Sequence, residues 1–362
     1  MAINKVKQWP AWSEYKVQGT TEANDPEYLA VKKEIIERYG ADALYRSWVK
    51  VCLELENVTE EIAAKGNSMI PIFDTAEIIS GGFTDEQQCE IKRVGAFVCR
   101  GTIPESETNL LYDNLKTFIK DNKQSIPAWP ESSPSMYVLH NSPTQNALRS
   151  HPNHLNLQRA LNSLWHDATN ETSAEPLLYL DGVRDREPGQ AFLGLGPHID
   201  AGSLCRWSEP IYRKTYENIF AGNPEKHDAF DLTIRKDADQ EKYKGPAHSG
   251  VLRSFQGWTA LTPAAPREGT IMVYPNVKTA IAYMLLRPFF NPPADPADIM
   301  DASKWKLDTE SSWFPGTTKP QSQYLSRSSH PHLRLEECLV YMPKVQPGDT
   351  VWWHCDVRDP AS

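Results

Sequence analysis

The character of the chain changes near Glu175, and this change limits the fold more than any other feature. Before this point, apolar side chains recur at helical spacing, as they do over 26–39. After it, short β-like segments such as 254–262 and 349–354 stand between turn residues. Helices in one half and strands in the other predict an α+β fold, in which helices pack on one side of a β barrel or sandwich.

Turn and capping residues place the first elements. Asp25 is a plausible helix cap because Pro26, at the first helical position, follows it. Thr84 opens another predicted helix in the same way. Further helices are predicted over 41–55, 105–122 and 146–169, and a buried strand is predicted over 94–101.

We expect the 362 residues to form one domain, because elaborated β barrels often run longer than an average domain. The part over 1–170 is expected to be mainly helical, and the part over 171–362 to hold the β core. The stretch 291–328 is rich in Pro, Asp, Ser and Thr, which is typical of a surface loop or lid.

Composition excludes several classes of protein. A net charge of -9 argues against nucleic-acid binding, which requires a basic face for phosphates. The chain has no apolar run long enough to cross a membrane, and its start lacks the apolar core of a secretory signal. A cytoplasmic protein that acts on a small molecule is therefore expected, with an oligomeric state that the sequence does not indicate. The cysteines lack CxxC spacing and are expected to be free thiols: Cys52, Cys89, Cys99, Cys205, Cys338 and Cys355.

The sharpest local pattern is the triplet of His198, Ile199 and Asp200. Side chains two residues apart on a strand point to the same face, so the imidazole and the carboxylate could bind one metal ion. With one further His they would form a facial triad, which leaves open positions that suit Fe(II), oxygen and a bidentate co-substrate. The triplet alone is a weak signal, but it follows an apolar segment and precedes a Gly-Ser turn.

Three histidines are candidates for the third ligand. His354 ends the short apolar strand that follows the turn at 347–349, and it is the candidate for the distal ligand. His330 and His332 are rivals that lie nearer to a loop. The alternative for each of the three is an ordinary hydrogen-bonded histidine.

Five motifs in a fixed order resemble the YbiU/Gig-like family, which is placed with the iron and 2-oxoglutarate oxygenases. The resemblance covers about 30–357, and its motifs are at 194–207, 228–231, 254–262, 330–333 and 347–356. It implies a double-stranded β-helix (jelly-roll) core with added helices.

The resemblance also exposes a departure near the end of the chain. The family pattern has a His where this chain has Asp359, and it continues with further strands. Either the chain is truncated and lacks its distal His, or His354 has taken over that role. The missing segment would also carry the Arg that pairs with 2-oxoglutarate.

Other side chains are candidates for the pocket. Arg206 could hold the carboxylate of 2-oxoglutarate through a bidentate pair, although a structural salt bridge is the alternative. Gln256 and Trp258 alternate on one face of a predicted strand and could contact substrate, or they could belong to the core. Arg184 and Arg186 are either surface charges or pocket cations.

These observations predict an oxidoreductase that binds Fe(II), uses 2-oxoglutarate and O2, and oxidises a C–H bond of a small metabolite by hydroxylation, desaturation or cyclisation. One alternative is a catalytically inactive jelly-roll protein with a binding or regulatory role. Another is a cupin-like metal enzyme that does not use 2-oxoglutarate.

Overall fold

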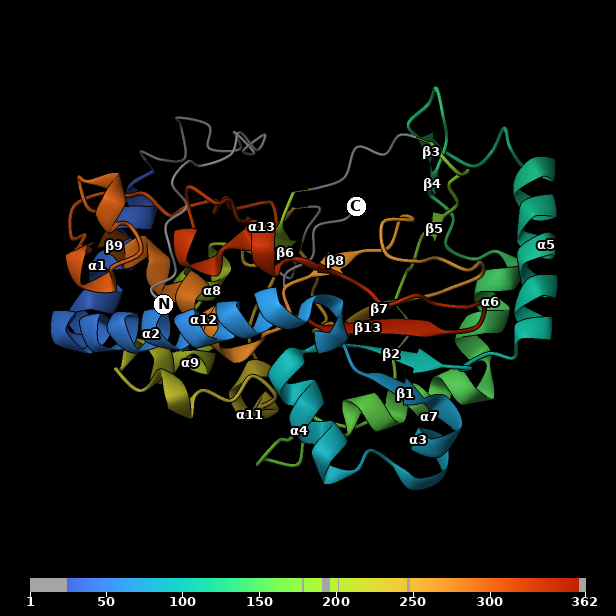
Figure 1. Ribbon diagram of the computed structural model, residues 1–362, viewed down its shortest axis with the longest axis horizontal. Helices are drawn as coiled ribbons and strands as arrows, with labels where there is room; N and C mark the ends of the chain where they lie inside the picture. Colours follow the sequence, from blue (N-terminus) through green and yellow to red (C-terminus); the bar gives the residue numbers. More distant parts are fainter. Residues whose placement is uncertain (1–24, 178, 191–195, 201, 246–247, 358–362) are drawn as a thin grey trace.

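The computed structural model describes residues 25–177, 179–190, 196–200, 202–245 and 248–357 (Figure 1). The α-helices are α1 (Pro26–Tyr39), α2 (Ala41–Lys65), α3 (Thr75–Gly81), α4 (Asp85–Val94), α5 (Glu105–Asp121), α6 (Pro143–Ser150), α7 (Pro152–Asn162), α8 (Cys205–Ser208), α9 (Pro210–Thr215), α10 (Glu217–Phe220), α11 (Leu232–Arg235), α12 (Lys278–Leu286) and α13 (Leu335–Cys338). Short 3-10 helices occupy Gly66–Met69, Pro224–Lys226, Arg287–Phe289, Pro296–Asp298, Ala302–Lys304 and Pro331–Leu333.

The strands are short and form several small sheets. They are β1 (Ile72–Asp74), β2 (Ala96–Arg100), β3 (Ala128–Trp129), β4 (Met136–Tyr137), β5 (Val183–Arg184), β6 (His198–Ile199), β7 (Phe255–Thr259), β8 (Met272–Val273), β9 (Phe290–Asn291), β10 (Lys306–Leu307), β11 (Gln323–Tyr324), β12 (Val340–Tyr341) and β13 (Thr350–His354). The main sheet has the order β1-β2-β13-β7, β3-β4-β5 form a second, and β6-β11, β8-β12 and β9-β10 form pairs.

The main sheet joins distant parts of the chain. Its strand β13 pairs antiparallel with β2 on one side and with β7 on the other, while β1 runs parallel to β2 (Figure 1). All five residues of β13 are buried. The two halves of the chain therefore share one sheet, so the division into a helical half and a strand half is only approximate.

The fold is mixed α/β, which confirms the coarse prediction, but a jelly-roll core is not confirmed. The sheets do not close into a barrel over the described residues. Helices α8 to α11 occupy 205–235, within the half that was predicted to hold the β core. Pro, Gly and polar turn residues keep most strands to two or three residues, so helices and loops fill the space between them.

Several local predictions are confirmed. Asp25 accepts a hydrogen bond from the backbone N–H of Glu27 and caps α1. Thr84 and Gln87 form a capping box at the start of α4. The strand predicted over 94–101 is β2, and the helix predicted from Glu105 is α5.

Two helix boundaries were predicted wrongly. The helix that starts at Ala41 does not end at Leu55 but continues to Lys65, and the Thr59 hydroxyl donates to the carbonyl of Leu55 within it. The helix predicted over 146–169 is instead the pair α6 and α7, which meet at His151. Pro152 requires this break because a proline disfavours helical backbone in the residue before it.

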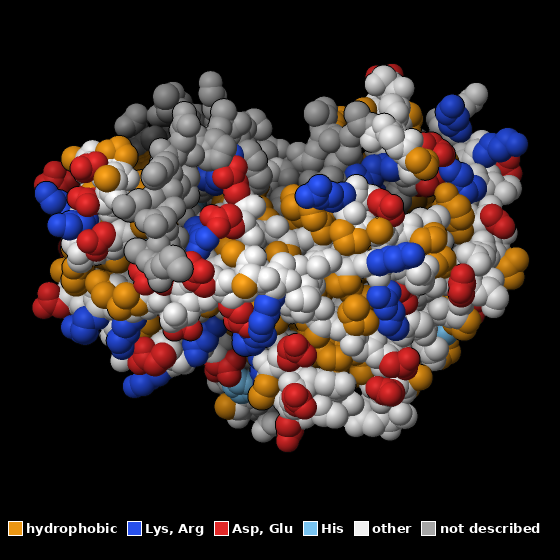
Figure 2. All heavy atoms as spheres, viewed as in Figure 1, with side chains coloured by type: hydrophobic (Ala, Val, Ile, Leu, Met, Phe, Trp, Pro, Cys, Tyr) orange, Lys and Arg blue, Asp and Glu red, His pale blue; other side chains and the backbone are white. Residues whose placement is uncertain are grey.

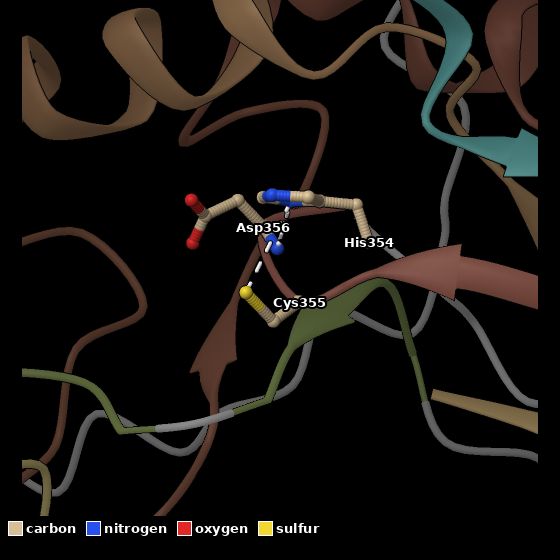
Figure 3. A group of neighbouring side chains, drawn as sticks. All are labelled: His354, Cys355 and Asp356. Atoms are coloured by element: carbon tan, nitrogen blue, oxygen red, sulfur yellow. Dashed lines mark hydrogen bonds between the residues drawn. The ribbon is translucent and has the colours of Figure 1, made fainter. Parts of the chain in front are cut away.

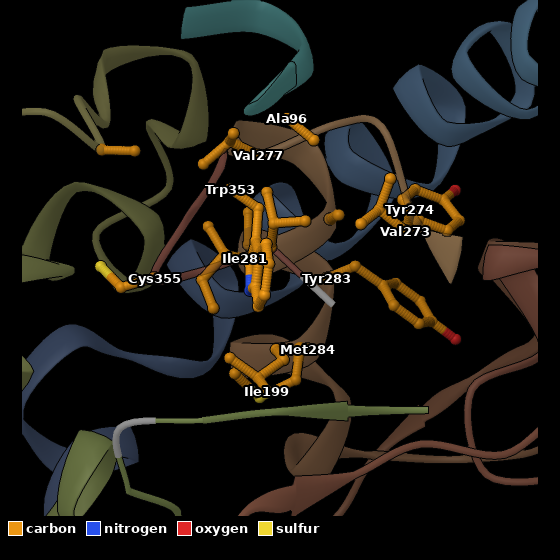
Figure 4. Close-up of a cluster of buried hydrophobic side chains, with 14 of the residues drawn as sticks. Ala96, Ile199, Val273, Tyr274, Val277, Ile281, Tyr283, Met284, Trp353 and Cys355 are labelled. Atoms are coloured by element: carbon orange, nitrogen blue, oxygen red, sulfur yellow. The ribbon is translucent and has the colours of Figure 1, made fainter. Parts of the chain in front are cut away.

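The core centres on α12, which the sequence did not predict. Seven of its nine residues are buried, so it has no polar face and no amphipathic period. It packs against the long helix α2 and contributes to the hydrophobic cluster in Figure 4, which also contains Ile199 from β6 and Trp353 from β13. This cluster supports both β6 and the main sheet from the inside.

The stretch 291–328, predicted as a surface loop or lid, contains short 3-10 helices and two-residue strands. Trp305 is 2% exposed, and the Asp308 carboxylate accepts a hydrogen bond from the Lys32 ammonium at 2.8 Å. Ion pairing and aromatic packing thus hold this stretch against α1 and α2.

The distribution of surface charges and the state of the cysteines can be compared with what the composition predicts. Acidic and basic side chains are interspersed on the face shown in Figure 2, and hydrophobic ones gather on its right-hand half. Within the described ranges, no helix combines the length and apolar character needed to cross a bilayer. All six cysteines are free, as predicted, and only Cys89 is exposed.

Candidate functional site

A large pocket of about 2630 Å³ opens between the main sheet, helices α6 and α7, and the segment 179–190. Its lining includes residues of β7 and β13, together with His198 and Asp200 beside β6. The pocket combines aromatic walls with charged side chains, as is typical of small-molecule sites. The structure therefore places the predicted ligand pair at a cavity.

His198 and Asp200 lie on the same side of the chain, as their spacing predicts. The Nε2 atom of His198 is 3.5 Å from Oδ1 of Asp200. The Nδ1–H of His198 donates to the carbonyl of Gly196 at 2.9 Å, which leaves Nε2 facing the carboxylate. The Ser322 hydroxyl, just before β11, donates to Oδ1 of Asp200 at 2.9 Å and orients that carboxylate.

This pair fits two adjacent positions of a metal site. Two donor atoms that bind one ion at right angles, each about 2.1 Å away, lie roughly 3 Å apart, and the observed separation of 3.5 Å is close to that. A neutral imidazole and a carboxylate, with a hydrogen bond behind the imidazole, are typical ligands of Fe(II) in oxygenases.

The structure does not bring His354 to this pair. Its Nε2–H donates to the carbonyl of Ala229, and its Nδ1 accepts from the backbone N–H of Asp356, each at 3.0 Å. The ring stacks on Trp165 with 4.7 Å between centroids, and His354 is absent from the pocket lining. Both ring nitrogens are engaged in these hydrogen bonds, so neither has a lone pair to offer a metal ion.

His354, Cys355 and Asp356 also lie together, with their potential ligand atoms within 4.8 Å of one another (Figure 3). Their chemistry argues against a cation. Both ring nitrogens of His354 are already hydrogen-bonded within the protein. Both oxygens of Asp356 already bind guanidinium groups. We therefore read this group as structural.

The rival histidines lie elsewhere. His332 is buried among Trp48, Tyr283 and Trp305, and its Nδ1 interacts with the Tyr283 hydroxyl at 3.0 Å. His330 interacts with the Ser329 hydroxyl through Nδ1. Neither lines the pocket. Asp359, at the position where the family pattern has a His, lies outside the described residues.

Arg206 lies against the backbone of Asp200 and does not line the pocket. Its Nη1 donates to Oδ1 of Asp356 at 2.8 Å and to the Tyr216 hydroxyl at 2.7 Å, and its Nη2 donates to the backbone carbonyl of Asp200 at 2.8 Å. The side chain is fully buried. These contacts favour the structural salt bridge over a role in holding 2-oxoglutarate, and they make Arg206 a positioning residue for the Asp200 backbone.

Asp356 is the centre of this buried network. Arg235 binds both of its oxygens, at 2.6 and 2.9 Å, in addition to Arg206. Burial by itself would raise the pKa of Asp356, but the guanidiniums of Arg235 and Arg206 hold it well below its usual range. The sequence did not single out Arg235 or Asp356, because their pairing joins residues more than a hundred positions apart.

The other predicted pocket residues do line the cavity. Gln256 and Trp258 lie on β7 and contribute to the lining. Arg184 and Arg186 also line it, and the Arg186 guanidinium donates to the carbonyl of Gly269 at 2.7 Å. Burial, followed by the charge of Arg184, lowers the pKa of Arg186. Whether these residues contact a substrate stays a prediction.

Two further lining residues were missed by the sequence analysis. Ser322 holds Asp200, and Arg253 stands two residues before β7. Ser322 lies in a segment without periodicity, so no local pattern connects it with Asp200. Arg253 precedes a motif of the family resemblance but is not part of it.

Comparison with known proteins decides the family. The profile of the Gig2-like family matches residues 23–359. The chain belongs to the Gig2-like family. It is 31% identical over 310 residues to the uncharacterized protein YbiU of Escherichia coli (strain K12). The aligned region covers 82% of this chain and 69% of YbiU.

Solved structures of family relatives share the fold. The GlcNAc-inducible Gig2 protein of Candida albicans is 28% identical, with a TM-score of 0.83 over 92% of this chain and 72% of that one. A Salmonella typhimurium LT2 protein that is provisionally named an oxidoreductase is 26% identical, with a TM-score of 0.77 over 94% of this chain and 81% of that one.

Proposed function

We propose that this Gig2-like protein is a non-haem Fe(II)/2-oxoglutarate-dependent oxygenase that oxidises a C–H bond of a small metabolite. The observation that carries the proposal is the pair of His198 Nε2 and Asp200 Oδ1, 3.5 Å apart at a large pocket. The provisional oxidoreductase name of the Salmonella relative agrees with it.

His198 and Asp200 would hold the iron, which with 2-oxoglutarate supplies O2-dependent oxidation when bound. The carbonyl of Gly196 keeps the His198 proton on Nδ1, so that Nε2 can act as a ligand. The Ser322 hydroxyl and the Arg206 contact to the Asp200 backbone hold the carboxylate in position. The aromatic side chains of Trp258 and Trp353 form part of the pocket wall.

The first test is residue-specific metal binding and turnover. His198→Ala and Asp200→Ala should each weaken Fe(II) binding by at least tenfold and abolish 2-oxoglutarate-dependent succinate formation. Each substitution removes one of the two side chains, an imidazole or a carboxylate, that are proposed to bind the metal ion. Metal content after anaerobic loading and succinate by mass spectrometry are the measurements.

His354→Gln is the informative comparison, since the structure engages both of its ring nitrogens in other bonds. It should keep the metal affinity of the wild type, apart from any loss of stability. Full activity in both the His198 and Asp200 variants would disprove the proposal.

A binding or regulatory protein without turnover is the second candidate. It is favoured by one observation: over the described residues, no group of three metal ligands includes His198 and Asp200. Binding of 2-oxoglutarate or a metabolite, without succinate formation under iron and oxygen, would support this candidate over an oxygenase.

A further inference from the structure

Several buried polar atoms at the pocket have no hydrogen-bond partner in the protein, and they share one chemical character. All are nitrogen donors, and none is an oxygen acceptor: Nη1 of Arg149, Nε1 of Trp165, Nε of Arg253, Nε2 of Gln256 and Nε1 of Trp353. A buried donor without an acceptor costs roughly 1–3 kcal/mol. The pocket therefore favours a ligand that presents oxygen acceptors.

Arg253 adds positive charge to this set. No carboxylate of the described residues pairs with its guanidinium, whereas Arg149 contacts an acid and Arg186 a backbone carbonyl at the same pocket. Its guanidinium lies over the ring of Tyr179, and the distance from the Arg253 Cζ atom to the ring centroid is 5.5 Å. A half-buried guanidinium that stacks on an aromatic ring and lacks an anionic partner is well suited to bind a carboxylate.

The register of the main sheet brings two of these donors, Gln256 and Trp353, side by side. Gln256 lies directly opposite Trp353 in the β7–β13 ladder, and directly opposite side chains point to one face. Arg253 lies three residues before Gln256, where β7 begins beside the end of β13. Trp353 belongs to the cluster in Figure 4, so its ring is held by the core.

We propose that this end of the pocket is an oxyanion subsite and that the substrate is a small organic acid. Its carboxylate pairs with Arg253, and its neighbouring oxygens accept hydrogen bonds from Gln256 and Trp353. The inference names the substrate class of the site proposed above, and in that sense it rests on the proposed function. The carboxylate of 2-oxoglutarate shares this chemistry, so the test separates the two sources.

The test measures binding to the full-length, metal-free protein, so it does not depend on iron chemistry. The probes are small acids with their matched neutral amides: D-glucuronate and D-glucuronamide, benzoate and benzamide, and L-lactate and L-lactamide. At least one acid should bind at least tenfold more tightly than its amide, as measured by calorimetry and tryptophan fluorescence. 2-Oxoglutarate with Mn(II) is the separate arm for the co-substrate.

Arg253→Gln should weaken binding of that acid at least tenfold, while Arg253→Lys should retain part of the affinity. Arg267→Gln is the matched control, because Arg267 also lines the pocket but is exposed and lies outside the β7–β13 end. It should change acid binding less than twofold. The thermal midpoints of the unliganded variants check that each one is folded.

Several outcomes would overturn the inference: no acid of the panel binds, an amide binds as well as its acid, or Arg253→Gln retains full affinity. It would also be overturned if Arg253→Gln impaired only 2-oxoglutarate binding, because Arg253 would then serve the co-substrate. Acid binding without succinate formation would contradict the proposed function alone, whereas succinate formation without acid binding would contradict this inference alone.

Discussion

At the scale of single residues, the most consequential group is the buried carboxylate of Asp356. It binds two fully buried guanidiniums, and one of these also holds the backbone carbonyl of Asp200. A buried ion pair is weak support for stability in itself, but removal of one partner leaves uncompensated charge in the interior. Asp356 therefore links the stability of the core to the position of a proposed metal ligand.

We expect Asp356→Asn to lower the free energy of unfolding by about 3–5 kcal/mol, because Arg206 and Arg235 would lose their buried counter-charge. Urea denaturation measures this change. Glu225→Gln is the control, since its pair with Lys50 is exposed on both sides and should contribute no measurable stability. Equal effects of the two substitutions would contradict the buried-charge argument.

At the scale of elements, the pairing of β7 with β13 leaves no room for a side chain at Gly257. A Cβ atom on Gly257 would lie 2.4 Å from the carbonyl oxygen of Val351 and 2.8 Å from the Trp352 ring. Neither a strand backbone nor a packed indole can move away easily. Glycine at this position lets the two strands that line the pocket lie in register.

Gly257→Ala should destabilise the protein by about 1–3 kcal/mol or more through overpacking, and it should also weaken ligand binding at the neighbouring Gln256. Chemical denaturation and calorimetry measure the two effects. Gly81→Ala is matched to it, because an added Cβ at Gly81 meets nothing within 4 Å at the end of α3. Stability of the Gly81 variant should be unchanged or slightly higher, and a similar loss in both variants would count against the close-contact argument.

The elements also show how far local patterns reach. The caps at Asp25 and Thr84 and the strand β2 were predicted because the decisive residues lie within a few positions of one another. Helix α12 was missed because it is apolar on every side, and burial on all faces removes the period that identifies a helix. The short strands β6, β8 and β12 owe their pairing to partners elsewhere in the chain rather than to their own length.

At the scale of the whole molecule, the interior holds histidines that stay neutral. Burial, followed by the charge of Arg287, lowers the pKa of His332 to about 3. Burial likewise lowers the pKa of His354 to about 3, although the charge of Asp356 opposes it. Both residues titrate near pH 6.5 in an unfolded chain. Between these values the unfolded state binds more protons than the folded state.

The free energy of unfolding should therefore fall as the pH is lowered from about 6.5 toward 4, by up to about 1.4 kcal/mol per pH unit for each of the two histidines. The stability that they contribute is fully present above pH 6.5. Urea denaturation at pH 7, 6 and 5 measures the slope. His332→Gln should reduce it, and a stability that stays constant from pH 7 to pH 5 would show that these side chains are not buried in neutral form.

The sequence alone determined the pairing of His198 with Asp200 and the five motifs that resemble the family, because both depend on spacing along the chain. Only the tertiary structure decided the roles of His354 and Arg206. Their bonds to Ala229 and Asp356 span more than a hundred residues, and neither side chain lines the pocket. The sequence gives the type of each side chain. Whether its lone pair or charge can bind a ligand depends on neighbouring groups that only the folded chain brings together.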